Sequence, residues 1–145
     1  MPINQDVFYM QQALELAKHA ESCDEVPVGA VIIFNNEIIS SGYNCPISTN
    51  DPTAHAEIIA MRNAAKKINN YRLVETTLYV TLEPCIMCIG AMIHARIKRL
   101  VFGALDPKTG ATKTINHRIE CQGEIMAKEC GEILSAFFKS KRKQS

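Results

Sequence analysis

The chain has 145 residues, the length of one ordinary domain, which is enough to bury roughly two thirds of the surface of the unfolded chain. Its formal net charge of +1 excludes a broadly basic coat for nucleic acid, although a local basic patch remains compatible with it. A hydrophobic content of 47% and a charged content of 21% are typical of a globular domain, so we expect a single domain over residues 1–145.

The first half of the chain predicts a helix, a hairpin and a second helix. The first helix is expected over residues 6–21, with Asn4 or Asp6 as its cap and an alanine-rich apolar face. The stretch "VGAVIIFNNEIISSGYN" predicts two antiparallel strands joined by a turn at "NN". After a loop with two prolines, Thr53 is expected to cap an apolar helix that begins within "DPTAHAEIIAMRNAAKK".

The second half predicts two parallel strands around a helix. "TTLYVTL" is typical of a buried strand, Pro84 precedes the helix "CIMCIGAMIHARI", and "RLVFGA" is the next strand. Residues 105–116 are expected to form a loop, "HRIEC" a short edge strand, and residues 124–138 a closing helix. These elements predict an α/β domain in which helices flank a mixed central sheet.

The chain carries no recognisable signal for export or for membrane insertion. Its N-terminal stretch "MPINQDVFYMQQ" has neither a basic start nor an apolar core, and its longest apolar run, "IMCIGAMI", is too short for a bilayer. We therefore expect a cytoplasmic protein that contacts no membrane. Disulfides are disfavoured there, so four scattered cysteines are interpreted as buried apolar residues or surface thiols. They are Cys23, Cys45, Cys121 and Cys130.

The remaining two cysteines and one histidine predict a metal site. Cys85 and Cys88 form a C-x-x-C pair at the start of one helix, and His55 stands at the start of another. The partial positive charge of a helix N-terminus favours thiolate, which is the form that binds metal. One imidazole and two thiolates suit Zn²⁺ and leave the fourth tetrahedral position for water. We predict one catalytic zinc ion per chain.

Two other interpretations of the C-x-x-C pair compete with catalytic zinc. The pair resembles a thioredoxin-like redox motif, but no aromatic residue flanks "CIMC" and the upstream H-x-E would then be unexplained. A closed structural zinc site would need a fourth ligand, for which His117 or Cys121 could be recruited. We favour the catalytic site over both.

Glu57 distinguishes a hydrolytic site from a structural one. Two positions after His55 on a helix, its side chain does not share the direction of the imidazole, so it suits a place beside the open coordination position better than a ligand position. A carboxylate there can take a proton from a zinc-activated water and deliver it to a substrate. The sequence therefore predicts hydrolytic chemistry with Glu57 as proton shuttle.

These residues carry a family resemblance. "HAE" followed by "PCIMC" is the H-x-E…P-C-x-x-C signature of zinc nucleobase deaminases. "EVPVGAVI", "DPTAHAEI", "TLEPCIMCIGAMIHARI", "VFGALDPKTGA", "NHRIE" and "FFKSKR" further resemble the bacterial tRNA-specific adenosine deaminases, within the zinc-dependent cytidine and deoxycytidylate deaminase superfamily. The matching stretches cover most of the chain from Glu25 onward.

The resemblance implies a three-layer cytidine-deaminase-like fold, a homodimer, and conversion of adenosine to inosine at the wobble position of a tRNA anticodon stem-loop. By matched position, it implies that His55, Cys85 and Cys88 bind zinc and that Glu57 moves protons. It also implies that Asn44, in "GYNCPI", hydrogen-bonds the target base, whereas the residues alone favour a turn there.

One segment departs from the family pattern. Family members usually carry a longer insert between "KTGA" and "NHR", where this chain has only "TKTI", so the segment between Gly110 and Asn116 is short. Whether it is naturally short or incomplete is a question that the sequence leaves open. The difference affects the expected RNA contacts and not the zinc site.

Two alternatives to a tRNA enzyme remain open at this point. The first is a zinc-dependent deaminase of a free base or nucleoside, of the guanine or cytosine type, and the second is a non-catalytic, zinc-stabilised RNA-binding module. The basic tail "FFKSKRKQS" favours RNA, although basic residues also suit the end of a helix. Its candidate RNA-binding residues are Lys139, Lys141, Arg142 and Lys143.

Overall fold

The computed structural model describes the backbone of residues 2–144 and the side chains of residues 5–143. In chain order, the described elements are α1 (Pro2–Ser22), β1 (Gly29–Phe34), β2 (Glu37–Tyr43), α2 (Pro46–Thr49), α3 (Ala56–Ile68), β3 (Thr77–Leu82), α4 (Ile86–Ala95), β4 (Arg99–Ala104), β5 (Glu120–Gln122) and α5 (Ala127–Gln144). Among these helices, none combines the length and the apolar character that crossing a bilayer requires.

The strands form one mixed sheet in the order β2-β1-β3-β4-β5. β1 is antiparallel to β2 and β3, whereas β3, β4 and β5 run parallel to one another. The predicted hairpin and the predicted parallel strand–helix–strand unit are both confirmed. β3 and β4 are buried along most of their length, which explains their nearly continuous apolar sequences.

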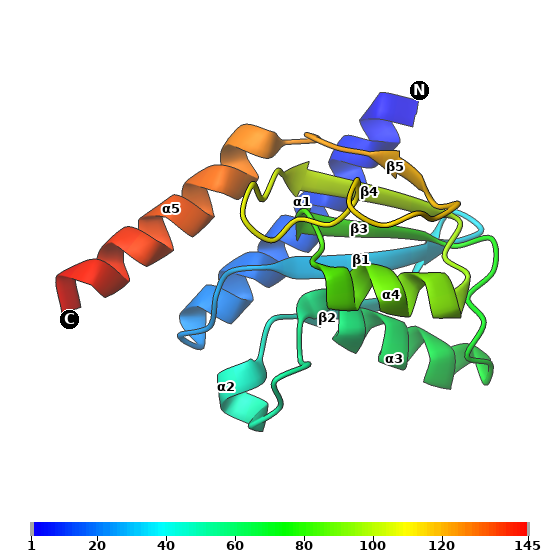
Figure 1. The fold of residues 1–145 in the computed structure, drawn as a ribbon, viewed down its shortest axis with the longest axis horizontal. Coiled ribbons are helices and arrows are strands. Elements are labelled where there is room, and N and C mark those ends of the chain that lie inside the picture. Colours follow the sequence, from blue (N-terminus) through cyan, green and yellow to red (C-terminus); the bar gives the residue numbers. More distant parts are fainter. Residues whose placement is uncertain (1, 145) are drawn as a thin grey trace.

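Helices cover both faces of the sheet (Figure 1). α3 and α4 enclose one core, which includes Ile32, Leu78 and Ile89. α1 and α5 enclose the other, which includes Val31 and Tyr79. Successive residues of a strand point to opposite faces, so Val31 and Ile32 of β1 contribute to different cores. The predicted α/β fold with a mixed sheet between helix layers is confirmed.

The start of α1 differs from the prediction. The helix begins at Pro2, so neither Asn4 nor Asp6 is its cap. Asp6 is buried, and its carboxylate accepts hydrogen bonds from the hydroxyl of Tyr79 and from both terminal nitrogens of Arg99. Its partners lie on β3 and β4, far along the chain, which is why a local capping rule misassigned it.

The C-terminal elements also shift. The predicted edge strand "HRIEC" is shorter and shifted: β5 begins at Glu120, ends one residue beyond the predicted stretch at Gln122, and pairs with β4. α5 begins at Ala127 rather than at Glu124, because Glu124 and Met126 have φ values of 64° and 58°. Such left-handed residues do not continue into a right-handed helix. The helix then extends to Gln144, beyond the predicted end at Phe138.

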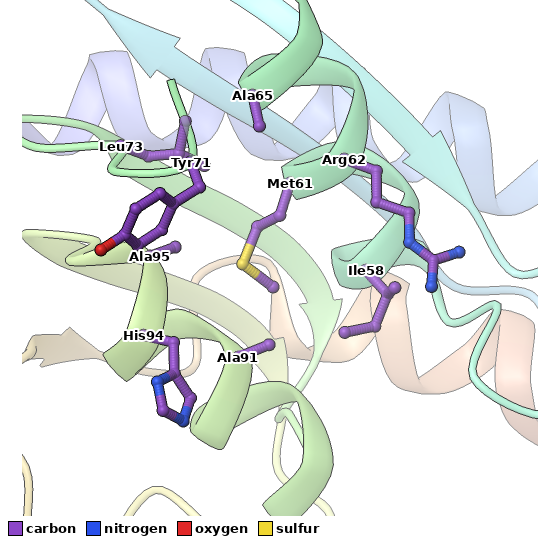
Figure 2. Close-up of a pocket in the computed structure, with 9 residues that line it drawn as sticks. All are labelled: Ile58, Met61, Arg62, Ala65, Tyr71, Leu73, Ala91, His94 and Ala95. Atoms are coloured by element: carbon purple, nitrogen blue, oxygen red, sulfur yellow. The ribbon is translucent and has the colours of Figure 1, made fainter. Parts of the chain in front are cut away.

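α3 and α4 leave an apolar groove on their outer side (Figure 2). We call it the α3/α4 groove, and its volume is about 330 Å³. Figure 2 shows the side chain of Met61 lying between the two helices, with Tyr71 at one end and Ala91 on α4. The lining residues are Ile58, Met61, Arg62, Ala65, Tyr71, Leu73, Ala91, His94 and Ala95. The groove therefore exposes apolar surface in the layer that carries the candidate site.

Candidate active site

The N-termini of α3 and α4 bring three metal-binding side chains together. His55 and Cys85 are the N-cap residues of the two helices, and Cys88 lies in the first turn of α4. His55 Nδ1 is 3.6 Å from the Sγ of Cys85 and 3.6 Å from the Sγ of Cys88. With usual bond lengths, nitrogen and sulfur ligands of one tetrahedral zinc ion stand about 3.6 Å apart. These three residues, called the metal triad below, therefore fit Zn²⁺.

The structure does not support the closed structural zinc site. Within residues 5–143, the cluster of potential ligand atoms around His55 comprises the metal triad alone. Both ring nitrogens of His117 are engaged elsewhere, with the carbonyl of Thr112 and the N–H of Ile119. Cys121 is exposed and its thiol donates to the carbonyl of Ile119. A three-residue site leaves one tetrahedral position for water.

The two thiols of the metal triad differ in proton affinity. A hydrogen bond from Cys88, together with one from His55, lowers the pKa of Cys85 to about 3. Donation to Cys85 and burial raise the pKa of Cys88. All six cysteines are free thiols, so Cys85 and Cys88 form no disulfide. A divalent cation would displace the remaining proton from Cys88 and hold both sulfurs as thiolates.

Glu57 lies in the first turn of α3, beside the metal triad, and is buried. Burial raises the pKa of its carboxyl to about 7, and the charge of Cys85 adds to this rise. Its own backbone N–H, His55 and Cys88 oppose the shift. A carboxyl with a pKa near neutrality can both take up and release a proton, which suits a general acid–base group.

Asn44 lies beside the metal triad and Glu57, and it also accepts a hydrogen bond from the backbone at the start of α3. Its Oδ1 accepts a hydrogen bond of 2.8 Å from the N–H of Ala56, the first residue of the helix. The prediction that Thr53 caps this helix is therefore wrong, since its N-cap residue is His55. The close approach depends on Gly42, where a Cβ atom would lie 2.5 Å from the carbonyl oxygen of Ala56. With Oδ1 engaged, Asn44 has its amide nitrogen to offer a ligand.

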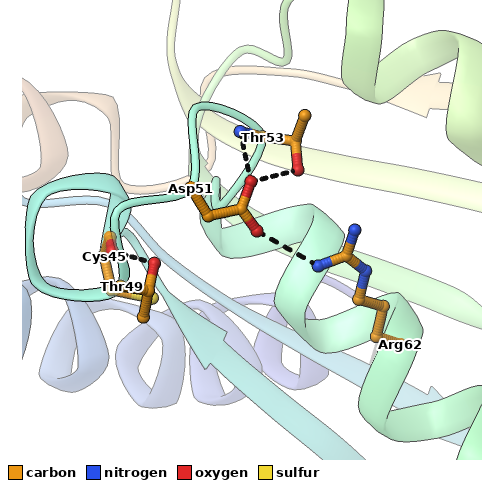
Figure 3. Close-up of polar contacts among 5 residues, drawn as sticks. All are labelled: Cys45, Thr49, Asp51, Thr53 and Arg62. Atoms are coloured by element: carbon orange, nitrogen blue, oxygen red, sulfur yellow. Dashed lines mark hydrogen bonds and ion pairs between the residues drawn. The ribbon is translucent and has the colours of Figure 1, made fainter.

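The loop between Asn44 and His55 is fixed by Asp51 (Figure 3). Its Oδ1 accepts hydrogen bonds from the N–H and hydroxyl of Thr53, and its Oδ2 accepts one of 3.4 Å from Arg62 on α3. The hydroxyl of Thr49, at the end of the short helix α2, donates to the carbonyl of Cys45. The hydroxyl of Thr53 is thus used by Asp51 and not by the helix.

The candidate site contains a pocket of about 90 Å³, which we call the catalytic pocket. The sequence predicted His55, Glu57, Cys85 and Asn44, and the structure brings all four to its lining. The sequence interpretation missed the other lining residues, which precede β1, stand at the end of β3 or follow β4. They are Val26, Val28, Leu82, Glu83, Asp106 and Thr109. Turn-forming residues in "LDPKTG" gave the one local signal for the wall that follows β4.

A second hollow adjoins this pocket and contains part of the predicted basic tail. We call it the basic hollow; its volume is about 590 Å³ and its lining residues are Asp106, Lys108, Thr109, Phe138, Lys141 and Arg142. Lys139 and Lys143 are exposed and are not part of it. Lys141 also forms an ion pair with Asp24. Lys108 and Phe138 were not predicted, because the hollow forms between the loop after β4 and α5, which are distant in sequence.

Comparisons with known proteins agree with this geometry. Residues 3–104 match the cytidine and deoxycytidylate deaminase zinc-binding region. The chain is 53% identical to the tRNA-specific adenosine deaminase of Haemophilus influenzae, over 93% of this chain and 84% of that protein. It is 51% identical to that of Buchnera aphidicola, over 98% and 99%. This alignment spans 150 residues against a chain of 145, so the relative carries residues that this chain lacks.

A solved structure is similar as well. It comes from a study of A-to-I editing by tRNA:A34 deaminases at the wobble position of transfer RNA. Its TM-score is 0.83 at 40% sequence identity, and the match covers 88% of this chain and 99% of that one. The family match and the near full-length identities together show the family. The chain belongs to the tRNA-specific adenosine deaminases, within the family defined by the cytidine and deoxycytidylate deaminase zinc-binding region.

Proposed function

We propose that the chain converts adenosine to inosine at the wobble position of a tRNA anticodon by hydrolysis, with one zinc ion per chain. The observation that carries the proposal is the convergence of the metal triad, Glu57 and Asn44 on one pocket. The tRNA-specific relatives at 53% and 51% identity support the choice of substrate over a free base.

The proposed division of labour follows the geometry. His55, Cys85 and Cys88 would hold the zinc ion, which supplies an activated water near neutral pH. Two thiolates would balance its charge, so the site can be buried without an uncompensated cation. The amide nitrogen of Asn44 would donate a hydrogen bond to the target base, since its oxygen is held by Ala56.

Glu57 would perform the proton transfers. It takes a proton from the attacking water and gives one to N1 of the adenine ring as the water oxygen adds to C6. It then delivers the second proton to the amino group, which leaves as ammonia. The products are inosine and ammonia, so one water molecule accounts for all the atoms. A carboxyl with its pKa raised to about 7 suits this repeated exchange.

The basic hollow would hold the RNA strand beside the reacting base. Lys108, Lys141 and Arg142 offer positive charge, and the half-exposed ring of Phe138 offers a surface for stacking. Asp106 and Thr109 line both this hollow and the catalytic pocket, so the two adjoin each other. Lys139 and Lys143 would add longer-range attraction to phosphate from the same helix.

A second copy of the chain would cover the α3/α4 groove, giving a homodimer. The groove is lined mostly by apolar side chains, and Tyr71 is 65% exposed beside it. Ile68 at the end of α3, Val74 in the loop that follows it and Ile86 at the start of α4 are further exposed apolar residues. Three of its lining residues are alanines, which allow the helices of a second copy to approach closely.

We further propose that residues 1–145 act as one deaminase domain. Both cores pack against the same five-stranded sheet, and the residues that line the catalytic pocket come from segments between Val26 and Thr109. Because the proposed substrate is a tRNA, we expect the protein to work in the cytoplasm.

The proposal is tested by offering three substrates to the same zinc-loaded preparation. These are an anticodon stem-loop RNA with adenosine at the wobble position, free adenosine, and free guanine. We expect inosine in the stem-loop and little release of ammonia from the small substrates. Turnover of the free compounds instead would support a nucleoside or base deaminase. RNA binding without any ammonia would support a non-catalytic module.

A further inference from the structure

The carboxylate of Glu83 joins the end of β3 to the loop that follows β4. Its Oε1 accepts a hydrogen bond of 3.1 Å from the N–H of Asp106. Its Oε2 accepts two from Thr112, of 3.3 Å from the N–H and 2.5 Å from the hydroxyl. Glu83 therefore holds both ends of the segment 106–112, which we call the wall segment.

The wall segment forms one side of the catalytic pocket. Asp106 and Thr109 line that pocket together with Glu83 itself. Asp106 folds the segment further, because its carboxylate accepts hydrogen bonds from the N–H of Lys108 and from the N–H and hydroxyl of Thr109. The carboxylate of Glu83 also lies so close to Gly110 that a Cβ atom there would stand 2.2 Å from Oε1.

Thr112 is itself the first residue of "TKTI", the short segment that departs from the family pattern. Its carbonyl oxygen accepts a hydrogen bond of 2.8 Å from Nε2 of His117, whose Nδ1 accepts one from the N–H of Ile119. On the other side, the N–H of Ala111 donates to the carbonyl of Pro84, next to Cys85. Thr112 and its neighbour Ala111 are thus tied to Glu83 and Pro84, which precede Cys85, and Thr112 is tied through His117 to the residues before β5.

We propose that Glu83 is a positioning residue for the deamination, acting through Thr112. By binding Asp106 and Thr112, it sets the distance between the wall segment and the metal triad and so the width of the catalytic pocket. A bond from a hydroxyl to a carboxylate is among the stronger hydrogen bonds, so its removal should loosen the wall without unfolding the sheet. This inference rests on the proposed function.

Three substitutions at two positions test the inference. Thr112→Val removes the hydroxyl and keeps the shape, Thr112→Ser keeps the hydroxyl, and Glu83→Gln removes the carboxylate. Thr114→Val is the matched control, because the hydroxyl of Thr114 donates to the carbonyl of Ala111 in the same loop and not to Glu83. Zinc content, Tm, kcat and KM on the stem-loop RNA are measured for each.

We expect Thr112→Val to lower kcat/KM about tenfold, and Thr112→Ser to restore most of it, with zinc content and Tm close to those of the control. Glu83→Gln combined with Thr112→Val should lose little more than Glu83→Gln alone, because the hydroxyl–carboxylate bond that Thr112→Val removes is already lost with the carboxylate. Equal kcat/KM for Thr112→Val and the control, or additive losses in the double variant, would overturn the inference.

Amide hydrogen exchange separates this inference from the proposed function. In Glu83→Gln, the amides of Asp106 and Thr112 should exchange faster than in the unmodified chain, whereas those of β3 should not. If the amides exchange faster in Glu83→Gln but the unmodified chain forms no inosine, the contacts of Glu83 are supported and the proposed function is refuted. Unchanged exchange at both amides would refute the positioning by Glu83 even in an active enzyme.

Discussion

The side-chain oxygen of Asn44 accepts a hydrogen bond of 2.8 Å from the N–H of Ala56, directly after His55. Asn44 thereby gives the first N–H of α3 a hydrogen-bond partner and presents its own amide nitrogen to the catalytic pocket. The orientation of the amide is fixed by the helix, since only its oxygen can accept from Ala56. The expected contact with the base is therefore tied to the backbone that carries a metal ligand.

Asn44→Asp separates these two functions of the side chain. The carboxylate can still accept from Ala56 and suits the positive end of the helix, but it has no donor for the base. We expect zinc content and Tm to be retained while kcat/KM on the stem-loop RNA falls about tenfold or more. Asn44→Ala should lose activity and also about 1 kcal/mol of stability through the lost cap. Full activity in Asn44→Asp would contradict the proposed contact.

The contacts of Asp6 predict an acid-dependent part of the stability. Burial alone would raise its pKa, but hydrogen bonds from Arg99 and Tyr79 outweigh it and lower the pKa below 3.8. The contribution of Asp6 to the free energy of unfolding is therefore fully present above the unfolded-state pKa of about 4. It is lost as the pH falls through the lower folded-state pKa. Asp6→Asn should cost about 2–3 kcal/mol near pH 7 and progressively less below pH 4.

Urea unfolding of both proteins between pH 7 and pH 2.5 measures that difference, with zinc removed from both so that loss of the metal does not intervene. Glu15→Gln is the matched control, because its pair with Lys18 is exposed on the same helix. We expect no more than a small, pH-independent change there. A difference for Asp6→Asn that stays constant down to pH 2.5 would contradict this account.

Neutralising the basic hollow should weaken RNA binding in a salt-dependent way. If Lys108→Gln and Arg142→Gln each remove one phosphate contact, the slope of log K against log salt should flatten by about 1.4. The control is Lys66→Gln with Lys67→Gln, two exposed residues in the last turn of α3, at the opposite end from His55. Equal slopes for both double variants would show that RNA does not contact the hollow.

Charge placed in the α3/α4 groove should separate the proposed dimer. Ala91→Arg would bury a cation against apolar surface, which is unfavourable without a partner. Sedimentation at micromolar concentration should show a dimer for the unmodified chain and a monomer for this variant. Gln11→Arg, on the exposed side of α1, should remain dimeric. A monomeric unmodified chain would refute the dimer and leave the catalytic proposal untouched.

The metal triad and Glu57 could be predicted because their information is local. C-x-x-C and H-x-E each stand at the start of a helix, and residue chemistry restricts what they can bind. Asn44 needed the family resemblance, because its partner Ala56 becomes a neighbour only when β2 packs on α3. Local reasoning put Thr53 in that capping position, although Asp51 binds its hydroxyl.

Other features depend on long-range packing and escaped sequence reasoning altogether. Glu83 meets Thr112 across 29 residues, and Asp6 meets Arg99 across 93. Neither pair has a spacing rule that could reveal it. In contrast, α2 had local signals in the sequence, namely Pro46 at its first position and an asparagine, Asn50, directly after its end, where the structure has the left-handed conformation that asparagine tolerates.

The most direct test of the account compares Glu57→Gln with His55→Ala on one substrate. For each variant, zinc content, RNA affinity and single-turnover inosine formation on the stem-loop are measured on the same preparation. His55→Ala should lose zinc and activity together, because it removes a member of the metal triad. Glu57→Gln should keep zinc and RNA affinity while inosine formation falls by about 10²–10⁴-fold or more. A Glu57→Gln variant that keeps most of its rate, or that loses its zinc, would contradict the proton transfer assigned to this residue.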